Sequence, residues 1–304
     1  MNPLLKHRIF IASIFAVLYV GMALLVGWRD DHWAMLFLVL GLLLAHQVSY
    51  KVVITLSAFA IFWITYDFLR IYPNYMVSPV HVMQPYNLEL QLFGIMDNGK
   101  LVVPCEWFIS RTSDVLSLIA GFSYLLWMPA PMIFALYLLA KKKGAVIDFT
   151  YGFLLTNFIG YIAYYSYPAA PPWYFINYGN ATDFTIPGSE GLLSEFDRLI
   201  GTPIFNGIYA KNANVFAAIP SLHSSYPVIS LLAAIKNKEK WWIPFFCLLA
   251  VGTWFAAVYS QHHYIIDVLL GILCALTAFG LITLMDKWSY YQRFRKAMTT
   301  ELEN

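Results

Sequence analysis

Eight long apolar segments, separated by polar connections, constrain this chain more than any other feature of its sequence. They lie near residues 8–28, 32–48, 51–70, 114–140, 145–166, 217–235, 241–259 and 263–286. A helix needs about 20 mostly apolar residues to cross a bilayer. With 60% hydrophobic and only 12% charged residues, the chain is predicted to be an all-α, polytopic transmembrane helical bundle with about eight spans.

Net charge, cysteines and the N-terminal residues further limit the kind of membrane protein that this chain can be. A net charge of +2 is too small to indicate a nucleic-acid partner. The three cysteines are scattered and predict neither a disulfide framework nor a thiolate metal site. Lys6 and Arg8 precede the first apolar segment without the small-residue cleavage site of a secretory signal, which favours a retained membrane anchor. Nothing in the sequence predicts an oligomeric state.

Lysine and arginine are distributed unevenly between alternate connections. Thirteen of the 19 fall on one side of the eight-span arrangement: Lys6, Arg8, Lys51, Lys141, Lys142, Lys143, Lys236, Lys238, Lys240, Lys287, Arg293, Arg295 and Lys296. Because cytoplasmic loops carry the excess of positive charge, we expect both termini in the cytoplasm. Two polar islands, around His223 and His263, then face the opposite side, which is periplasmic in a bacterial inner membrane and luminal in a Golgi membrane.

These islands lie at the heads of apolar segments. In YSQHHYIIDVLLG, His263 and Asp267 are four residues apart and would share one face of a helix. In IPSLHSSYP, His223 precedes another apolar segment. An imidazole held by a carboxylate is a better nucleophile or base, and a second imidazole can supply the matching proton. A helix start also favours an anion, so the three residues together fit attack on phosphorus.

Other interpretations of the histidines stay open at this point. Each ring could hydrogen-bond a neighbouring helix without any chemistry. His223, His262, His263 and Asp267 could hold zinc, although their spacing matches no usual zinc motif. The histidines could also relay protons in a non-enzymatic membrane transporter or scaffold.

The same islands resemble a known family. PSLHSSYP is similar to the PSGH block of the type 2 phosphatidic acid phosphatase superfamily, and HHYIIDVLLG to its His-x-x-x-Asp block. The variant forms resemble the inositol phosphorylceramide synthases, through YPAAPPWYF at 167–175, IPSLHSSYP and SQHHYIID, and through HVMQPYNLELQLFGI at 81–95. The His-Tyr-x-x-Asp form is shared with sphingomyelin synthases.

The resemblance implies a six-helix-type phosphatidic acid phosphatase-like core within the bundle. We expect N-terminal transmembrane helices plus an outer loop in 1–113, a catalytic transmembrane core in 114–286 and a cytoplasmic tail in 287–304. By resemblance, His263 is the nucleophile that forms a phosphohistidine, and Asp267 orients it. His223 is then the general acid for the leaving alcohol and the base for the incoming one. No metal or cofactor is implied.

The chain departs from the phosphatase members, which carry a Lys…Arg-Pro block and a Ser-Arg pair seven residues before the nucleophile. Here YYSYPAAPPWY contains no cation, and Ala256 and Ala257 occupy the Ser-Arg positions. A phosphomonoester bears about −1.5 to −2 charge and is bound by Arg and Lys forks, whereas a phosphodiester bears only one negative charge. The missing arginines therefore favour exchange of a lipid headgroup over hydrolysis.

By resemblance, the activity is transfer of phosphoinositol from phosphatidylinositol to ceramide or dihydroceramide, with release of diacylglycerol. A lipid phosphate phosphatase of the same superfamily is the nearest alternative. No residue pattern here distinguishes inositol from choline or ethanolamine.

Other residues are candidates for substrate contacts. Arg70 could replace a missing cation, or could merely pair with Asp67 at a helix end. Lys211 could reach the phosphate, or could be a solvated loop lysine. Trp173 and Tyr174 could wall the pocket or belong to an interfacial aromatic belt. The remaining candidates adjoin the histidines: Ser221, Gln261, His262 and Tyr264.

Overall fold

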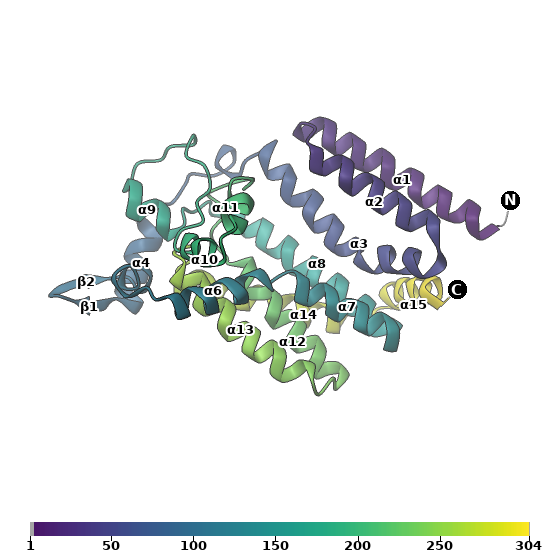
Figure 1. Ribbon diagram of the computed structural model, residues 1–304. Coiled ribbons are helices and arrows are strands. Elements are labelled where there is room, and N and C mark those ends of the chain that lie inside the picture. The colour runs from purple at the N-terminus through teal and green to yellow at the C-terminus, as the bar shows by residue number, and fades with distance from the viewer. Residues whose placement is uncertain (1–2, 304) are drawn as a thin grey trace.

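The computed structural model describes residues 3–303 as a helical bundle with one small hairpin (Figure 1). Residues 1, 2 and 304, which belong to the predicted regions 1–113 and 287–304, lie outside the described residues. The long helices of the bundle are α1 (Pro3–Val26), α2 (Asp30–Ala45), α3 (Gln47–Asp67), α6 (Asp114–Leu125), α7 (Pro129–Lys141), α8 (Lys143–Ser166), α12 (Leu222–Asn237), α13 (Trp242–Tyr259), α14 (Ile265–Met285) and α15 (Ser289–Glu303).

Shorter elements form the connections between these helices. They are η1 (Phe68–Arg70), η2 (Asn74–Met76), α4 (Met83–Phe93), β1 (Ile95–Asp97), β2 (Lys100–Val102), α5 (Pro104–Trp107), η3 (Ile109–Arg111), α9 (Pro172–Tyr178), α10 (Leu193–Ile200) and α11 (Ile204–Tyr209). The stretch HVMQPYNLELQLFGI at 81–95 contains α4. Figure 1 shows α4, α9 and the hairpin at the end of the bundle opposite to both chain termini.

A helix coincides with every apolar segment, but the predicted count of eight spans is not confirmed. Among the described residues, five helices are long and apolar enough to cross a membrane, or six if α6 and α7, bent by 44°, form one span. The helices α2 and α12 have 16 residues each, or about 24 Å at 1.5 Å per residue. That length falls short of a hydrocarbon core of about 30 Å.

The helices α1, α2 and α3 lie side by side and pack on the remainder through α3, which contacts α7 and α8. The turn between α1 and α2 depends on Gly27, whose φ of 95° lies in the region that favours glycine. Two residues after Gly27, the Arg29 backbone N–H donates a hydrogen bond to His32 Nδ1 at 3.2 Å. This hydrogen bond holds Arg29 at the connection between α1 and α2.

The helix α12 is central to the predicted catalytic core, where it packs against α8, α13 and α14. A buried hydrogen bond from the Tyr226 hydroxyl to Asn157 Oδ1, at 2.7 Å, joins it to α8. Its N-terminus contacts α14 closely, since the Ser221 backbone N–H donates to the Asp267 carbonyl at 2.9 Å. This contact places the two predicted catalytic segments next to each other.

The predicted cytoplasmic tail is the helix α15, which docks on the bundle. Arg295 lies 3.1 Å from Asp148 on α8, and the Tyr291 hydroxyl donates to the same carboxylate at 3.0 Å. The Tyr50 hydroxyl donates to Glu301 at 2.7 Å, which joins α15 to α3 as well. These contacts lie at the end of the bundle that carries both chain termini (Figure 1).

The close contact of α12 with α14 predicts the effect of a single methyl group. A Cβ atom at Gly271 would overlap the carbonyl oxygen of Ser221, which is backbone and cannot swing away. We expect Gly271→Ala to push the two segments apart. The melting temperature in detergent should fall by several degrees, and the activity of the predicted catalytic site should fall by at least about tenfold.

Gly280→Ala is the matched control, because Gly280 lies on the same helix with nothing within 4 Å of an added Cβ. Alanine is the better helix former, so this variant should melt at or above the wild-type temperature. Equal behaviour of the two variants would contradict the packing described above.

Candidate active site

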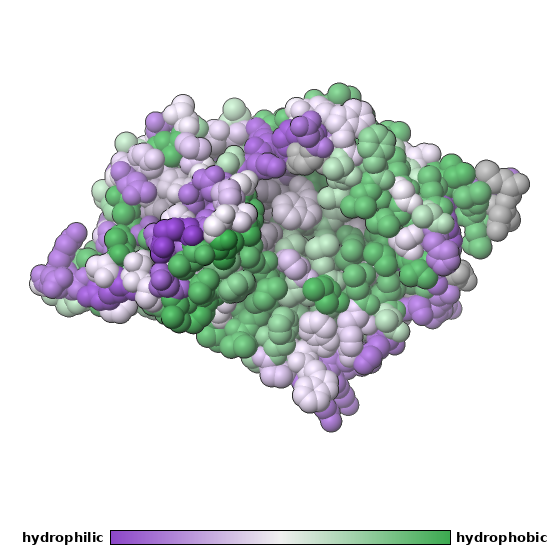
Figure 2. Space-filling view, viewed as in Figure 1, coloured by the Kyte–Doolittle hydropathy of each residue, from purple (hydrophilic) through white to green (hydrophobic). Residues whose placement is uncertain are grey.

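One cavity connects the predicted catalytic histidines with the N-terminal helices. It encloses about 430 Å³ and is lined by His223 and His263 together with side chains of α1, α2, α3, α6, α8 and α11. Figure 2 shows that the surface is hollowed where α3 faces the later helices of the bundle. Hydrophilic residues lie along the upper rim of the hollow and hydrophobic residues below it. A concave, mostly apolar site with a few polar groups is typical of small-molecule binding.

His263 lies just before α14 rather than on it, so the predicted shared helix face is wrong in detail. The helix begins at Ile265, and Tyr264 is its N-cap. His263 Nδ1 nevertheless lies 3.4 Å from Asp267 Oδ2. The reason is that Asp267 occupies the first turn and reaches back, where its Oδ2 accepts the Tyr264 N–H at 2.9 Å. One carboxylate therefore holds both the helix start and the imidazole.

The contact between His263 and Asp267 is longer than a good hydrogen bond. Among the described residues, His263 Nδ1 and Asp267 Oδ1 have no hydrogen-bond partner. Contacts of this kind often tighten only when substrate binds. Burial lowers the pKa of His263 to about 4, although the Ala218 backbone opposes the shift, so the ring is neutral at pH 7 and available as a nucleophile.

His223 lies in the first turn of α12 and faces His263. The two ring centroids are 5.9 Å apart, close enough for one phosphate group to contact both rings. Tyr124 and Trp127 hold the His223 ring, with centroid distances of 4.9 Å and 4.7 Å. No hydrogen bond to another described residue occupies the ring nitrogens of His223, which leaves them available to a ligand in the cavity.

His262 also lines the cavity, but both of its nitrogens are in use. Its Nδ1 lies 2.7 Å from the Ser260 hydroxyl and its Nε2 2.9 Å from the Ser189 carbonyl oxygen. The ring stacks on Tyr209 at 4.2 Å and lies parallel to Tyr124 at 5.8 Å. These contacts give His262 a role in fixing the loop before α14.

The other candidates beside the histidines are buried but do not line the cavity. Ser221 caps α12 and donates its N–H to the Asp267 carbonyl. Gln261 has a φ of 65° and offers its carbonyl to the Trp173 N–H at 3.0 Å. Tyr264 is the fully buried N-cap of α14. In this structure the three residues hold the segments around His223 and His263 in position. None of the three lines the cavity, so their contacts with substrate stay a prediction.

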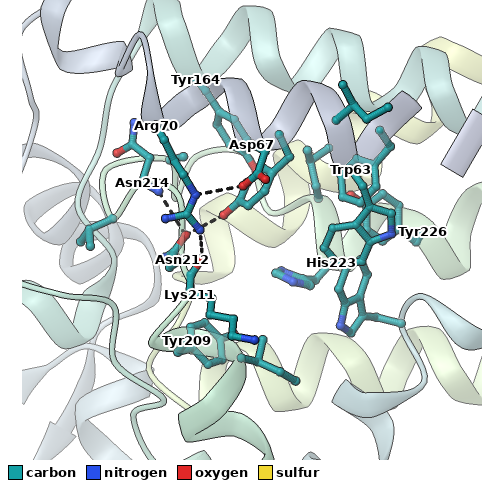
Figure 3. Close-up of a pocket in the computed structure, with 18 of the residues that line it drawn as sticks. Trp63, Asp67, Arg70, Tyr164, Tyr209, Lys211, Asn212, Asn214, His223 and Tyr226 are labelled. Carbon is teal, nitrogen blue, oxygen red and sulfur yellow. Dashed lines mark hydrogen bonds and ion pairs between the residues drawn. The ribbon is translucent and has the colours of Figure 1, made fainter. Parts of the chain in front are cut away.

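Arg70 and Lys211 both line the cavity, on its outer side. Arg70 Nε lies 2.9 Å from Asp67 Oδ1, and its Nη2 donates to the Lys211 carbonyl oxygen. The ion pair predicted as an alternative role for Arg70 is therefore present in the cavity wall itself. Figure 3 shows Arg70, Asp67 and Lys211 on one side of the pocket and His223 on the other.

Trp173 and Tyr174 are buried, with 3% and 0% of their surfaces exposed, so neither belongs to a lipid-facing aromatic belt. Trp173 lines the cavity. Tyr174 lies behind it, where its hydroxyl accepts the Asp183 N–H at 2.7 Å and fixes the loop after α9.

A buried carboxylate that the sequence did not single out supports α14 from outside. Glu89 on α4 is fully buried, and its oxygens accept the N–H groups of Ile265 and Ile266 at 2.8 Å and 3.2 Å. These N–H groups belong to the first helical turn and have no partner within the helix. The available signal was one acidic residue between Leu88 and Leu90, in a helix that carries no other charged residue.

The zinc interpretation lacks a ligand set. Across residues 3–303, no three His, Cys, Asp or Glu side chains gather closely enough to hold a metal ion. The described lining of the cavity contains four imidazoles and four charged side chains: His32, His223, His262, His263, Arg29, Asp67, Arg70 and Lys211.

Known proteins are similar to the part of the chain that carries this site. The family model described as the PAP2 superfamily matches residues 99–281, a range that contains His223, His263 and Asp267. A Bacteroides thetaiotaomicron protein named phosphoinositol dihydroceramide synthase is 44% identical over 299 residues, which cover 96% of this chain and 98% of that protein.

Fungal proteins are similar over shorter stretches. An inositol phosphorylceramide synthase of Candida albicans is 28% identical over 59% of this chain and 41% of its own length. A catalytic subunit of inositol phosphorylceramide synthase from Saccharomyces cerevisiae is 30% identical over 44% of this chain and 36% of its own length. No solved structure matches the chain significantly.

The role of Glu89 can be tested by substitution. Glu89→Ala leaves two buried N–H groups without acceptors, at a cost of about 1–3 kcal/mol each, so the melting temperature should fall and turnover should drop at least about tenfold. Glu89→Gln keeps an acceptor and should stay within a few-fold of wild type. Glu106→Ala is the control, since Glu106 accepts from Tyr86 and Val103 and does not contact α14.

Glu89 also predicts a pH dependence. Burial raises its pKa to about 7, with the neighbouring Asp267 charge adding to the shift and the two backbone N–H groups opposing it. The folded state thus binds the proton more tightly than the unfolded state, so this group's contribution to stability is lost as pH rises from about 4.5 to about 7. The pH slope of the melting temperature should be shallower in Glu89→Gln, and an unchanged slope would contradict the burial of a titrating carboxyl.

Proposed function

The chain belongs to the PAP2 superfamily, and from this premise we propose that it is an integral membrane phosphotransferase that moves phosphoinositol from phosphatidylinositol to ceramide or dihydroceramide and releases diacylglycerol. The observation that carries the chemistry is the pair of facing imidazoles, 5.9 Å apart in one cavity, with the Asp267 carboxylate beside only one of them. The phosphoinositol group and the dihydroceramide acceptor are supported by the similarity to a phosphoinositol dihydroceramide synthase, which is 44% identical over 96% of this chain.

We propose a first step in which His263 attacks the phosphorus of the donor. A nitrogen–phosphorus bond forms, the bond from phosphorus to the diacylglycerol oxygen breaks, and His223 gives that oxygen its proton. Asp267 next to Nδ1 leaves Nε2 as the attacking atom and stabilises the positive charge that develops on the ring. The product of this step is a phosphoinositol group bound to His263.

In the second step the primary hydroxyl of the ceramide attacks the same phosphorus. His223 removes the hydroxyl proton, the nitrogen–phosphorus bond breaks, and His263 returns to its neutral form. Lys211 balances the charge of the phosphodiester in both steps, since its ammonium has no acceptor among the described residues and lines the same cavity. Trp173 and the aromatic wall keep water from the intermediate.

We also propose that both lipids enter sideways from the bilayer and that the site faces the periplasm or lumen. The hydrophobic surface beside the hollow in Figure 2 supports lateral entry. The positive charge of thirteen Lys and Arg residues on the opposite side supports cytoplasmic termini.

Product analysis tests the proposal directly. Purified protein in mixed micelles is incubated with dihydroceramide and one labelled phospholipid at a time, with inositol, ethanolamine, choline or glycerol as headgroup, or with phosphatidic acid. We expect an inositol-containing ceramide product and one equivalent of diacylglycerol. Release of inorganic phosphate from phosphatidic acid without any ceramide-dependent product would instead identify a phosphatase.

Two adjacent histidines provide a matched test of the nucleophile. His263→Ala should lower transfer by at least about a thousandfold and abolish an acid-labile phosphorylated species under rapid quench. His262→Phe keeps the aromatic stack with Tyr209 and loses only two hydrogen bonds, so it should still form that species. Full activity of His263→Ala, or label located on His262, would overturn the assignment.

A further inference from the structure

An ion cluster closes the outer end of the cavity, opposite the catalytic histidines. Asp67 at the end of α3 accepts from Arg29 Nη2 at 2.8 Å and from Arg70 Nε at 2.9 Å. His32 Nε2 lies 3.5 Å from the same carboxylate. Arg29, His32, Asp67 and Arg70 all line the cavity that also contains His223 and His263.

The cluster gives the cavity a positive charge. The charged side chains that line it are three bases and one acid: Arg29, Arg70, Lys211 and Asp67. Leaving the histidines out of the count, these groups sum to two positive charges. Among the described residues of the lining, the one carboxylate is that of Asp67, which two guanidinium groups already share, so a cationic ligand would meet repulsion from the bases there.

The hydrogen-bonding groups of the cluster suit a neutral polyol. Every ring hydroxyl both donates and accepts, whereas guanidinium groups only donate and carboxylates only accept. Arg29, Asp67 and Arg70 are 32%, 16% and 29% exposed at their side chains, so each keeps surface towards the cavity. The amides of Asn212 and Asn214 line the same wall, and Figure 3 shows them beside Arg70.

The cluster lies outside the part of the chain that the superfamily model matches. Arg29, Asp67 and Arg70 all precede residue 99, where the match to the PAP2 superfamily model begins, whereas the catalytic histidines lie within it. A group that selects the headgroup is expected outside the part that performs the displacement, because relatives of one superfamily share the displacement and differ in substrate.

We propose that Arg29, Asp67 and Arg70, with His32 beside them, form the subsite for the neutral polyol headgroup of the donor phospholipid and exclude headgroups that carry an ammonium group. The subsite rests on the proposed function, since it selects the donor for the transfer. The hydroxyls of the polyol donate to Asp67 and accept from the two guanidinium groups, while the phosphodiester extends towards Lys211 and His263.

Kinetics with a panel of donors test the subsite. In Arg29→Gln, the KM for phosphatidylinositol should rise by about tenfold or more with kcat within about threefold of wild type, because the lost guanidinium group contacts the headgroup and Asp67 but not the groups that perform the displacement. The preference for phosphatidylinositol over phosphatidylethanolamine should fall by about the same factor. Arg29→Lys keeps the charge without the fork, so it should lose polyol affinity while still excluding phosphatidylethanolamine.

Arg198→Gln is the control substitution. Arg198 also bridges two carboxylates, Glu195 and Asp114, but is 59% exposed and does not line the cavity. It should leave KM and donor preference unchanged. If Arg29→Gln behaves like this control, the cluster merely ties the N-terminal helices together and the proposal is wrong.

Competition on the wild-type protein gives a readout that does not depend on the folding of a variant. Glycerophosphoinositol should inhibit transfer at concentrations at least about tenfold below those of glycerophosphoethanolamine or glycerophosphocholine. Equal inhibition by all three compounds would overturn the subsite even if phosphoinositol transfer is observed. Absence of any ceramide product with wild-type protein would instead overturn the proposed function itself.

Discussion

The buried carboxylate of Asp267 is the constraint on which the site depends. Its Oδ2 accepts the N–H of Tyr264, the N-cap of α14, and lies 3.4 Å from the His263 imidazole, while its backbone carbonyl accepts the N–H of Ser221. One residue thereby fixes the helix start, the orientation of His263 and the head of α12. Glu89 completes the arrangement, because it satisfies the next two N–H groups of α14.

The sequence located the candidate groups better than it predicted their geometry. The spacing of His263 and Asp267 and the repeated position of histidines at the heads of apolar segments selected three groups that the fold brings together, because ionisable residues there are rare. Their catalytic roles stay a prediction. The predicted helical face was wrong, since a carboxylate in the first turn can cap the helix and reach the residue before it. Periodicity alone does not distinguish these two arrangements.

Other features could not be read from the sequence because they depend on tertiary contacts. In the sequence, Glu89 is one acidic residue among apolar neighbours. Its role depends on the packing of α4 against α14, which the sequence does not show. The 16-residue lengths of α2 and α12 were masked by apolar connections that extend the hydropathy signal. Arg29 lies 38 residues before Asp67, so no local pattern joins them, and only the fold brings both to the cavity that contains His223.

On these proposals, two parts of one chain divide the task, with displacement at phosphorus in the helices matched by the superfamily model and headgroup selection in the helices before them. The covalent intermediate is the central claim, and stereochemistry at phosphorus tests it most directly. Phosphatidylinositol made chiral with a phosphorothioate group is converted with dihydroceramide, and the configuration of the product is determined. Two in-line displacements through His263 predict net retention. Inversion would show direct transfer between the lipids and would contradict the phosphohistidine mechanism.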